Sequence, residues 1–175
     1  MHSLSFVEDP TRILRAIRFE QRYGFRVSPE TERLLKNAVQ QGFFHQLSGG
    51  RIMNELRLIC EEKSPTACFK RMQQFKLWAA IHPLLSLERN RETILEEAEK
   101  VLGWYRLLYL EPRPEPWRLF LLGLMAGVGD GESEIILRRL NFPPRQETDF
   151  LALRQATRQA LGQVVQWQNA DGPWS

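Results

Sequence analysis

The segment from residue 9 to residue 24 constrains the fold more strongly than any other part of this sequence. Asp9 followed by Pro10 predicts the start of a helix, because the carboxylate can accept hydrogen bonds from the amides of the first turn and proline has a helical φ. Gly24 predicts the end of that helix. At 3.6 residues per turn this segment has two distinct sides. One side is apolar, with Ile13, Leu14, Ala16 and Ile17, and the other is mostly guanidinium, with Glu8, Arg12, Arg15, Phe19 and Arg22. We therefore predict an amphipathic helix packed on a core, preceded by an extended segment over residues 1–8.

The rest of the chain repeats such helix signals and contains no sustained strand alternation. Ser-Pro pairs at residues 28–29 and 64–65 are helix starts, and glycine or proline ends most apolar-periodic stretches. The predicted fold class is all-α. Further helices are expected over residues 28–42, 48–60, 64–75, 92–109, 117–126, 132–140 and 146–167, with Phe43 and Phe44 in a buried turn.

Charge is divided unevenly along the chain. The formal net charge is +3, but residues 1–87 hold 13 Lys and Arg against 8 Asp and Glu, whereas residues 88–175 hold 11 against 13. The polar stretch 84–92 predicts a boundary, which gives two units, residues 1–85 and residues 86–175. The basic surplus of the first unit suits a nucleotide or RNA contact.

Asp9 and Arg12 are one helical turn apart, as are Glu8 and Arg12, so carboxylates and a guanidinium meet at a helix N-terminus. Adenine and cytosine carry an exocyclic amine beside a ring-nitrogen acceptor, whereas guanine and uracil carry a carbonyl in place of that amine. A carboxylate and an arginine can therefore read A or C and reject G and U. The alternative is that Asp9 only caps the helix and that Glu8 and Arg12 form a surface pair.

Two glycine-rich segments also admit two interpretations. Ser48-Gly49-Gly50 can cap a helix or let the backbone approach a phosphate at that helix N-terminus, and capping is favoured. The glycines around Asp130 follow no predicted strand, so a helix connector is favoured there over phosphate binding.

The segment Glu8–Arg12 and its continuation to Phe19 resemble the E-D-x-x-R nucleotide-reading motif of the class II tRNA nucleotidyltransferase and bacterial poly(A) polymerase family. Tyr23-Gly24-Phe25 and the segments 28–31, 47–56 and 81–84 resemble the same family's neck and body region. The resemblance covers the first half of the chain well and the second half only in its helical character. It implies a multi-helix neck over residues 1–85, with the nucleotide-reading helix, and a tRNA-binding helical body over residues 86–175.

The resemblance also implies roles for individual residues. Asp9 and Arg12 would contact the base edge of an incoming ATP or CTP, with Glu8 in support. Arg15 and Arg18 match the continuation of the motif and are expected to serve the triphosphate, the template helix or the RNA backbone. The residues expected to contact RNA are Arg22, Arg26 and Arg51. The motif does not separate A-adding from CCA-adding or poly(A)-adding enzymes, because adenine and cytosine offer the same donor beside the same acceptor.

Members of that family bind Mg²⁺ in a catalytic head that precedes the E-D-x-x-R motif. Two-metal phosphoryl transfer requires clustered carboxylates, and this sequence contains no D-x-D pair. We therefore expect a fragment of a nucleotidyltransferase that acts on the 3′ end of tRNA or another RNA. The N-terminal head of the same chain would be its absent partner, and the fragment would be inactive alone.

Two further classes of function remain open. A stand-alone helical RNA-binding module predicts salt-dependent RNA binding through the arginines between Arg12 and Arg26, unaffected by Asp9→Ala. A plain scaffold for protein partners would leave those arginines idle.

The sequence offers no metal site or membrane segment of its own. Cys60 and Cys68 lie in apolar helical contexts typical of reduced thiols, and His2, His45 and His82 share no ligand spacing. No apolar run reaches the ~20 residues needed to span a bilayer, and no signal sequence opens the chain. A cytoplasmic protein without membrane contact is therefore expected.

Overall fold

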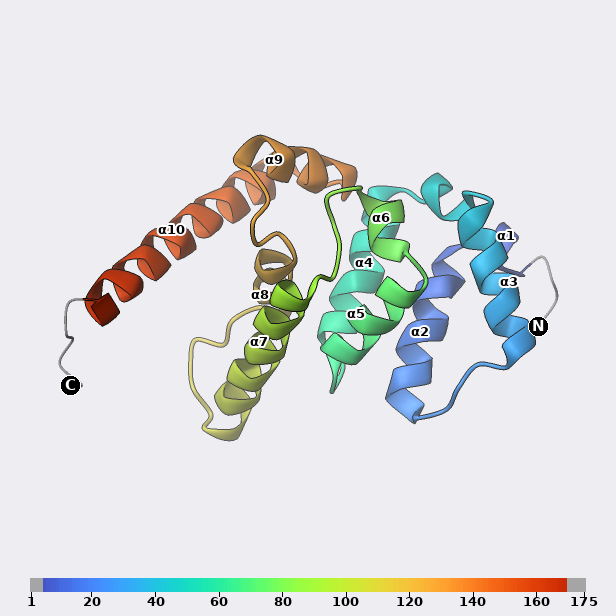
Figure 1. The fold of residues 1–175 in the computed structure, drawn as a ribbon, viewed down its shortest axis with the longest axis horizontal. Coiled ribbons are helices and arrows are strands. Elements are labelled where there is room, and N and C mark those ends of the chain that lie inside the picture. Colours follow the sequence, from blue (N-terminus) through green and yellow to red (C-terminus); the bar gives the residue numbers. More distant parts are fainter. Residues whose placement is uncertain (1–4, 170–175) are drawn as a thin grey trace.

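The computed structural model describes residues 5–169, and within that range all regular secondary structure is helical (Figure 1). The elements in chain order are α1 (Ser5–Glu8), α2 (Thr11–Tyr23), α3 (Pro29–Gln40), the 3-10 helix η1 (Phe43–Gln46), α4 (Gly49–Cys60), α5 (Pro65–Gln74), α6 (Leu77–Ile81), α7 (Arg89–Leu107), α8 (Pro116–Leu124), α9 (Asp130–Arg139) and α10 (Pro144–Asn169). The helices form an arc with α3 near one end and α10 at the other. The all-α prediction is confirmed.

The start of the chain departs from the predicted extended segment. Residues 5–8 form the short helix α1, because Phe6 is 1% exposed and anchors this turn in the core. α2 then begins at Thr11, after a turn through Pro10, and the Asp9 carboxylate accepts from the Thr11 amide as expected of a helix start (3.2 Å). α2 ends at Gly24, whose φ of 67° is the left-handed conformation that glycine adopts readily.

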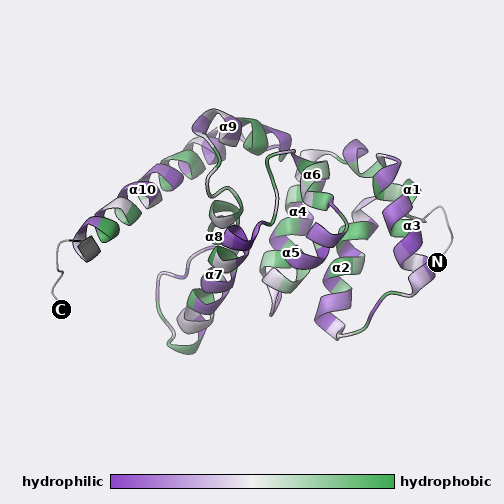
Figure 2. Ribbon diagram, in the orientation of Figure 1, coloured by the Kyte–Doolittle hydropathy of each residue, from purple (hydrophilic) through white to green (hydrophobic). Residues whose placement is uncertain are grey.

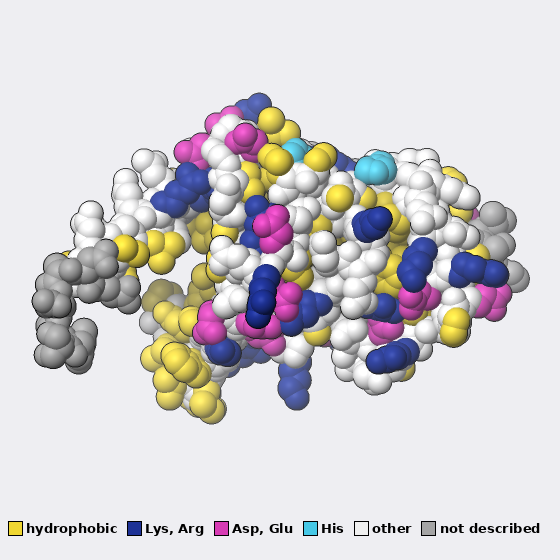
Figure 3. Space-filling view, in the orientation of Figure 1, with side chains coloured by type: hydrophobic (Ala, Val, Ile, Leu, Met, Phe, Trp, Pro, Cys, Tyr) yellow, Lys and Arg dark blue, Asp and Glu magenta, His cyan; other side chains and the backbone are white. Residues whose placement is uncertain are grey.

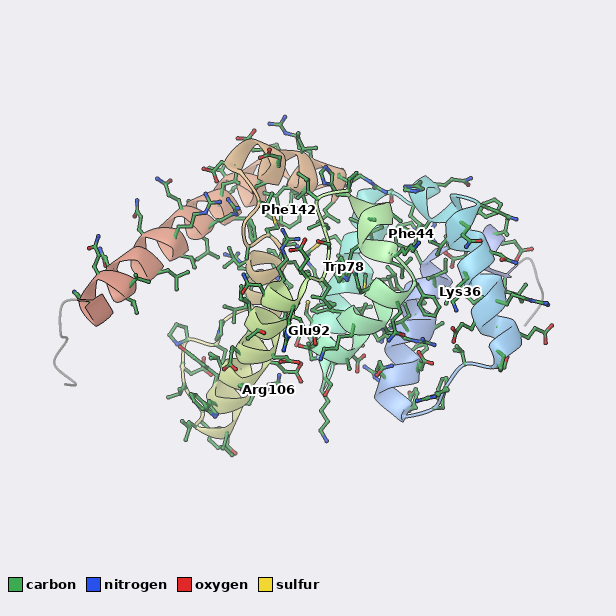
Figure 4. The ribbon with its side chains drawn as sticks, viewed as in Figure 1. Lys36, Phe44, Trp78, Glu92, Arg106 and Phe142 are labelled. Atoms are coloured by element: carbon green, nitrogen blue, oxygen red, sulfur yellow. The ribbon has the colours of Figure 1, made fainter. Side chains whose placement is uncertain are left out.

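One apolar core runs through the molecule, and the hydrophobic sides of neighbouring helices face one another (Figure 2). In α2, Ile13, Leu14 and Ile17 are at most 1% exposed, as the helical period predicted. Trp78 is also buried (Figure 4), with its indole nitrogen 3.1 Å from the Phe69 carbonyl oxygen. Phe69 packs edge-on against Phe120 of α8 at 5.4 Å between ring centroids. The core thus crosses residue 85, and the division at that position stays a prediction.

The N-terminus of α4 touches the end of α9. A Cβ atom at residue 49 would lie 1.9 Å from the Arg139 carbonyl oxygen, so only glycine fits at that position. The Arg139 guanidinium in turn donates to the Leu47 carbonyl oxygen (3.2 Å). The close backbone approach that the glycine pair suggested is therefore made, at Gly49, to another part of the protein.

The C-terminal end of α7, between the two ends of the arc (Figure 1), carries exposed apolar side chains. Trp104, Leu107, Leu108 and Tyr109, at and beyond the C-terminal end of α7, are each more than 60% exposed, and hydrophobic atoms gather at that end of α7 (Figure 3). Among the described residues, no helix is both long enough and apolar enough to cross a membrane.

Candidate functional site

Asp9 lies at the N-terminal end of α2, where its side chain is 22% exposed. Its Oδ1 atom accepts from the Thr11 hydroxyl (2.5 Å), the Thr11 amide (3.2 Å) and the Arg51 guanidinium (2.7 Å). The Thr11 hydroxyl contributes most to lowering the pKa of Asp9; burial opposes this, and the Thr11 amide and the charge of Arg51 add to it. Asp9 is therefore a charged hydrogen-bond acceptor at neutral pH.

Arg12 lies beside Asp9, as the one-turn spacing predicted. Its Nε atom is 3.8 Å from Asp9 Oδ2, and its side chain is 44% exposed. Its Nη1 atom donates to the Ser5 hydroxyl (2.6 Å) and the Ser5 carbonyl oxygen (3.3 Å). The two residues thus place an anionic acceptor and a cationic donor side by side at a partly open surface.

Glu8 belongs to α1 and is exposed. The surface pair between Glu8 and Arg12 does not form, because the guanidinium of Arg12 is turned toward Ser5 at the other end of α1. Among the described residues the Glu8 side chain makes no hydrogen bond or ion pair with Asp9 or Arg12. Its supporting role at the base edge stays a prediction.

The middle of α2 differs from the expected open row of arginines. Arg15 donates to Glu55 of α4 (2.7 Å), and Arg22 contacts Glu62 at the end of α4 (2.6 Å). Arg18 is 8% exposed and lies between both carboxylates, 3.3 Å from Glu62 and 3.7 Å from Glu55. The expectation of an open guanidinium side is therefore corrected, because two buried carboxylates neutralise most of it. Direct nucleotide contacts of Arg15 and Arg18 stay predictions.

The three arginines expected to contact RNA lie in different places. Arg22 is paired with Glu62, and Arg51 reaches Asp9 from the first turn of α4. Arg26 lies in the exposed loop after α2, at a groove bordered by α3 and α5, and has no ion pair among the described residues. The structure thus joins Arg51 to the Asp9 site and does not join Arg26 to it.

The sequence did not lead us to predict three residues that contact the arginines of α2, namely Ser5, Glu55 and Glu62. Glu55 and Glu62 are seven residues apart, the same spacing as Arg15 and Arg22, and each pair has a sequence separation of 40. Seven residues are two helical turns, so this matched spacing was a signal that could have predicted the pairing. The Ser5 contact carried no comparable signal, because it depends on the turn between α1 and α2.

The described residues contain no cluster of three or more potential metal ligands. Cys60 and Cys68 are buried free thiols, and burial raises the pKa of Cys68 to about 12, as expected of unreactive core cysteines. His45 is exposed and His82 ends α6, whereas His2 lies outside the described residues. The arrangement therefore provides an anionic acceptor beside a cationic donor at Asp9 and Arg12, and no cluster of potential metal ligands among the described residues.

Comparison with known proteins gives concordant results. Residues 24–88 match the family described as "Probable RNA and SrmB-binding site of polymerase A". The A-adding tRNA nucleotidyltransferase of Geobacter sulfurreducens is 48% identical over 130 residues, which cover 74% of this chain and 15% of that protein. The A-adding tRNA nucleotidyltransferase of Halalkalibacterium halodurans is 37% identical over 166 residues, which cover 86% of this chain and 38% of that protein. This chain therefore spans well under half the length of both relatives.

Solved structures agree with these sequence relatives. The Thermotoga maritima CCA-adding enzyme complexed with tRNA superposes with a TM-score of 0.83 at 30% identity, covering 98% of this chain and 40% of that chain. A CCA-adding enzyme complexed with ATP superposes with a TM-score of 0.84 at 29% identity, with the same coverage. Together with the Asp9 and Arg12 geometry, these similarities show that the chain belongs to the class II tRNA nucleotidyltransferase family and forms its neck and body region.

Proposed function

We propose that this chain reads the base of an incoming ATP or CTP during nucleotide addition to the 3′ end of tRNA or another RNA. The observation that carries the proposal is the placement of Asp9 Oδ2 beside the Arg12 guanidinium at the partly open end of α2. A charged carboxylate accepts from the exocyclic amine, and the guanidinium donates to the adjacent ring nitrogen. Guanine and uracil present a carbonyl to that carboxylate, so they are rejected.

The chemical step is assigned to another part of the same protein. The relatives are named as tRNA nucleotidyltransferases, and the described residues of this chain lack a carboxylate cluster for metal ions. We infer that a catalytic head on the same polypeptide holds Mg²⁺, which stabilises the attacking and leaving oxygens of phosphoryl transfer. In this division of labour the chain selects the nucleotide and holds the RNA, and it has no transferase activity alone.

RNA contact is assigned mainly to the exposed arginines. Arg26 and Arg51 are each exposed at the surface, and Arg22 is 44% exposed in spite of its contact with Glu62. These cations would bind phosphate groups of the acceptor end, a contribution that weakens as salt concentration rises. Arg15, which is 49% exposed, can reach a triphosphate, whereas buried Arg18 acts by holding α2 against α4.

The test is incorporation of each of the four nucleoside triphosphates onto tRNA by the full-length protein. Asp9→Ala and Arg12→Ala should reduce the preference for ATP and CTP over GTP and UTP by at least about 10-fold, the effect of losing one charged hydrogen bond. Their affinity for tRNA should change much less. The control is Arg33→Ala on α3, an exposed arginine without an ion pair among the described residues.

A different result would favour the stand-alone RNA-binding module. In that case tRNA binding would be salt-dependent and unaffected by Asp9→Ala, and neither variant would change nucleotide preference. The family match over residues 24–88 supports RNA binding under both accounts, so nucleotide preference is the measurement that separates them.

A further inference from the structure

Two buried hydroxyl side chains flank the pair formed by Asp9 and Arg12. Thr11 is 2% exposed and Ser5 is 9% exposed, although both lie next to a partly open surface. Each hydroxyl contacts one member of the pair, Thr11 at Asp9 and Ser5 at Arg12. A buried hydroxyl needs a hydrogen-bond partner, so these contacts restrict the orientation of both charged side chains.

The contacts at Asp9 distinguish its two carboxylate oxygens. Oδ1 accepts from the Thr11 amide, the Thr11 hydroxyl and Arg51, which occupies its acceptor capacity. Among the described residues Oδ2 accepts no hydrogen bond, and the Arg12 Nε atom lies 3.8 Å from it, which is too long for one. Oδ2 is therefore the oxygen that remains available to an incoming donor.

The contacts at Arg12 divide its guanidinium in the same way. Nη1 donates to the hydroxyl and the carbonyl oxygen of Ser5, whereas Nε lies on the side of Asp9. Because the guanidinium is planar, fixing Nη1 also fixes the direction of the remaining N–H groups. Asp9 Oδ2 and the Nε side of Arg12 lie next to each other, 3.8 Å apart.

We propose that Ser5 and Thr11 are positioning residues for base choice, which hold the non-reading atoms of Arg12 and Asp9 so that one acceptor and one donor face the base. This inference rests on the proposed function of Asp9 and Arg12. Without the hydroxyls, the carboxylate and the guanidinium can rotate, and either can then meet a carbonyl-bearing base with a different atom. Base choice therefore weakens while the charges that attract a nucleotide remain.

The test uses substitutions that keep side-chain shape. Thr11→Val removes the hydroxyl of a buried side chain at nearly constant volume, and Thr11→Ser restores the hydroxyl. Ser5→Ala removes the other hydroxyl but leaves the Ser5 carbonyl oxygen in contact with Arg12, so its effect should be smaller. Matched controls are Thr66→Val and Ser133→Ala, which remove buried hydroxyls bonded to the carbonyl oxygens of Leu95 and Gly129 and not to Asp9 or Arg12.

Two readouts separate positioning from a general structural role. The first readout, in the full-length protein, is the ratio of kcat/KM for ATP to kcat/KM for GTP. This ratio should fall about 10-fold in Thr11→Val, because one hydrogen bond to a charged group is lost. It should recover in Thr11→Ser. In the present chain, a carbon-13 NMR titration should find the pKa of Asp9 raised by Thr11→Val and unchanged by Thr66→Val. A variant that only loosened the fold would lower activity with all nucleotides alike.

The outcomes are distinguishable. If the wild-type protein does not prefer ATP or CTP over GTP and UTP, the proposed function fails and this inference fails with it. If the wild-type protein has that preference and Thr11→Val keeps it, the proposed function stands and the positioning role is overturned. Loss of preference in Thr11→Val, recovery in Thr11→Ser and retention in Thr66→Val support the inference.

Discussion

Arg12 and Arg18 lie on the same helix, six residues apart, but in opposite environments. Arg12 is 44% exposed at the N-terminal end of α2, with one guanidinium edge held by Ser5 and another beside Asp9. Arg18 is 8% exposed in the middle of α2 and lies between Glu55 and Glu62. We call the N-terminal end of α2 around Asp9 and Arg12 its open end, and the part around Arg18 its sealed middle.

The difference comes from what packs against each position. α4 runs beside the middle of α2, and α4 and the turn after it provide the buried carboxylates of Glu55 and Glu62. A buried charge is tolerated only when it is paired. At Arg12 the guanidinium contacts Ser5 of the short helix α1, and the side chain remains 44% exposed. An arginine-rich helix therefore need not be a single binding surface, because packing buries some of its arginines in ion pairs and leaves others accessible.

The largest effect is expected at the sealed middle. Glu62→Ala removes the carboxylate that contacts both Arg18 and Arg22 and leaves Arg18 buried with only the 3.7 Å contact to Glu55. Breaking a buried ion pair on one side costs about 3–5 kcal/mol, which urea denaturation of this chain would measure. The control is Glu61→Ala, at the neighbouring exposed residue, which should change the free energy of unfolding little. A loss below about 1 kcal/mol for Glu62→Ala, the value typical of exposed pairs, would mean that the middle of α2 is not sealed.

A smaller effect on the free energy of unfolding is expected when the pH is lowered, through protonation of Glu62. Burial acts to raise the pKa of Glu62, but hydrogen bonds from Arg22 and Arg18 outweigh it and hold the pKa below the usual 4.5 of a glutamate. Stability from Glu62 is therefore present above pH 4.5 and is lost as pH falls through the lowered folded-state pKa. The free energy of unfolding should fall less steeply with acid in Glu62→Gln than in wild type. Parallel curves for the two proteins would contradict this linkage.

Arg15→Ala should have an intermediate effect, because Arg15 is 49% exposed while its partner Glu55 is buried. We expect a loss of about 1–2 kcal/mol, since Glu55 loses its hydrogen bond and keeps only the longer contact with Arg18. Lys100→Ala is the comparison, because Lys100 and Glu97 are both more than 60% exposed. Equal losses in the two variants would show that the buried carboxylate adds nothing.

The smallest effect on stability is expected at the open end. Arg12→Ala should lower the free energy of unfolding by about 0.5–1 kcal/mol, because the Ser5 hydroxyl loses its hydrogen bond at a partly open surface. The same variant should have a large effect on nucleotide preference, as described for the incorporation assay. A destabilisation as large as that of Glu62→Ala would remove the contrast between the two ends of α2.

Local sequence signals determined most of the helices, although not α1 or α6, and the pairing of Asp9 with Arg12. The helical period placed Ile13, Leu14 and Ile17 in the core, and glycine marked the end of α2. Asp9 and Arg12 are three residues apart, so the helix alone brings them together. These features depend on interactions within one or two turns, which is why the sequence was sufficient to predict them.

Contacts between distant segments decided which side chains remain free. Arg51 reaches Asp9 across a separation of 42 residues, and Glu62 covers Arg18 across 44. Gly49 fits against Arg139, 90 residues away, because the two helix ends meet in space. The sequence by itself therefore determined an arginine-rich amphipathic helix with Asp9 beside Arg12 at its start. Only the tertiary structure decided that the middle of this helix is sealed, because burial and charge pairing arise when α2 and α4 pack together.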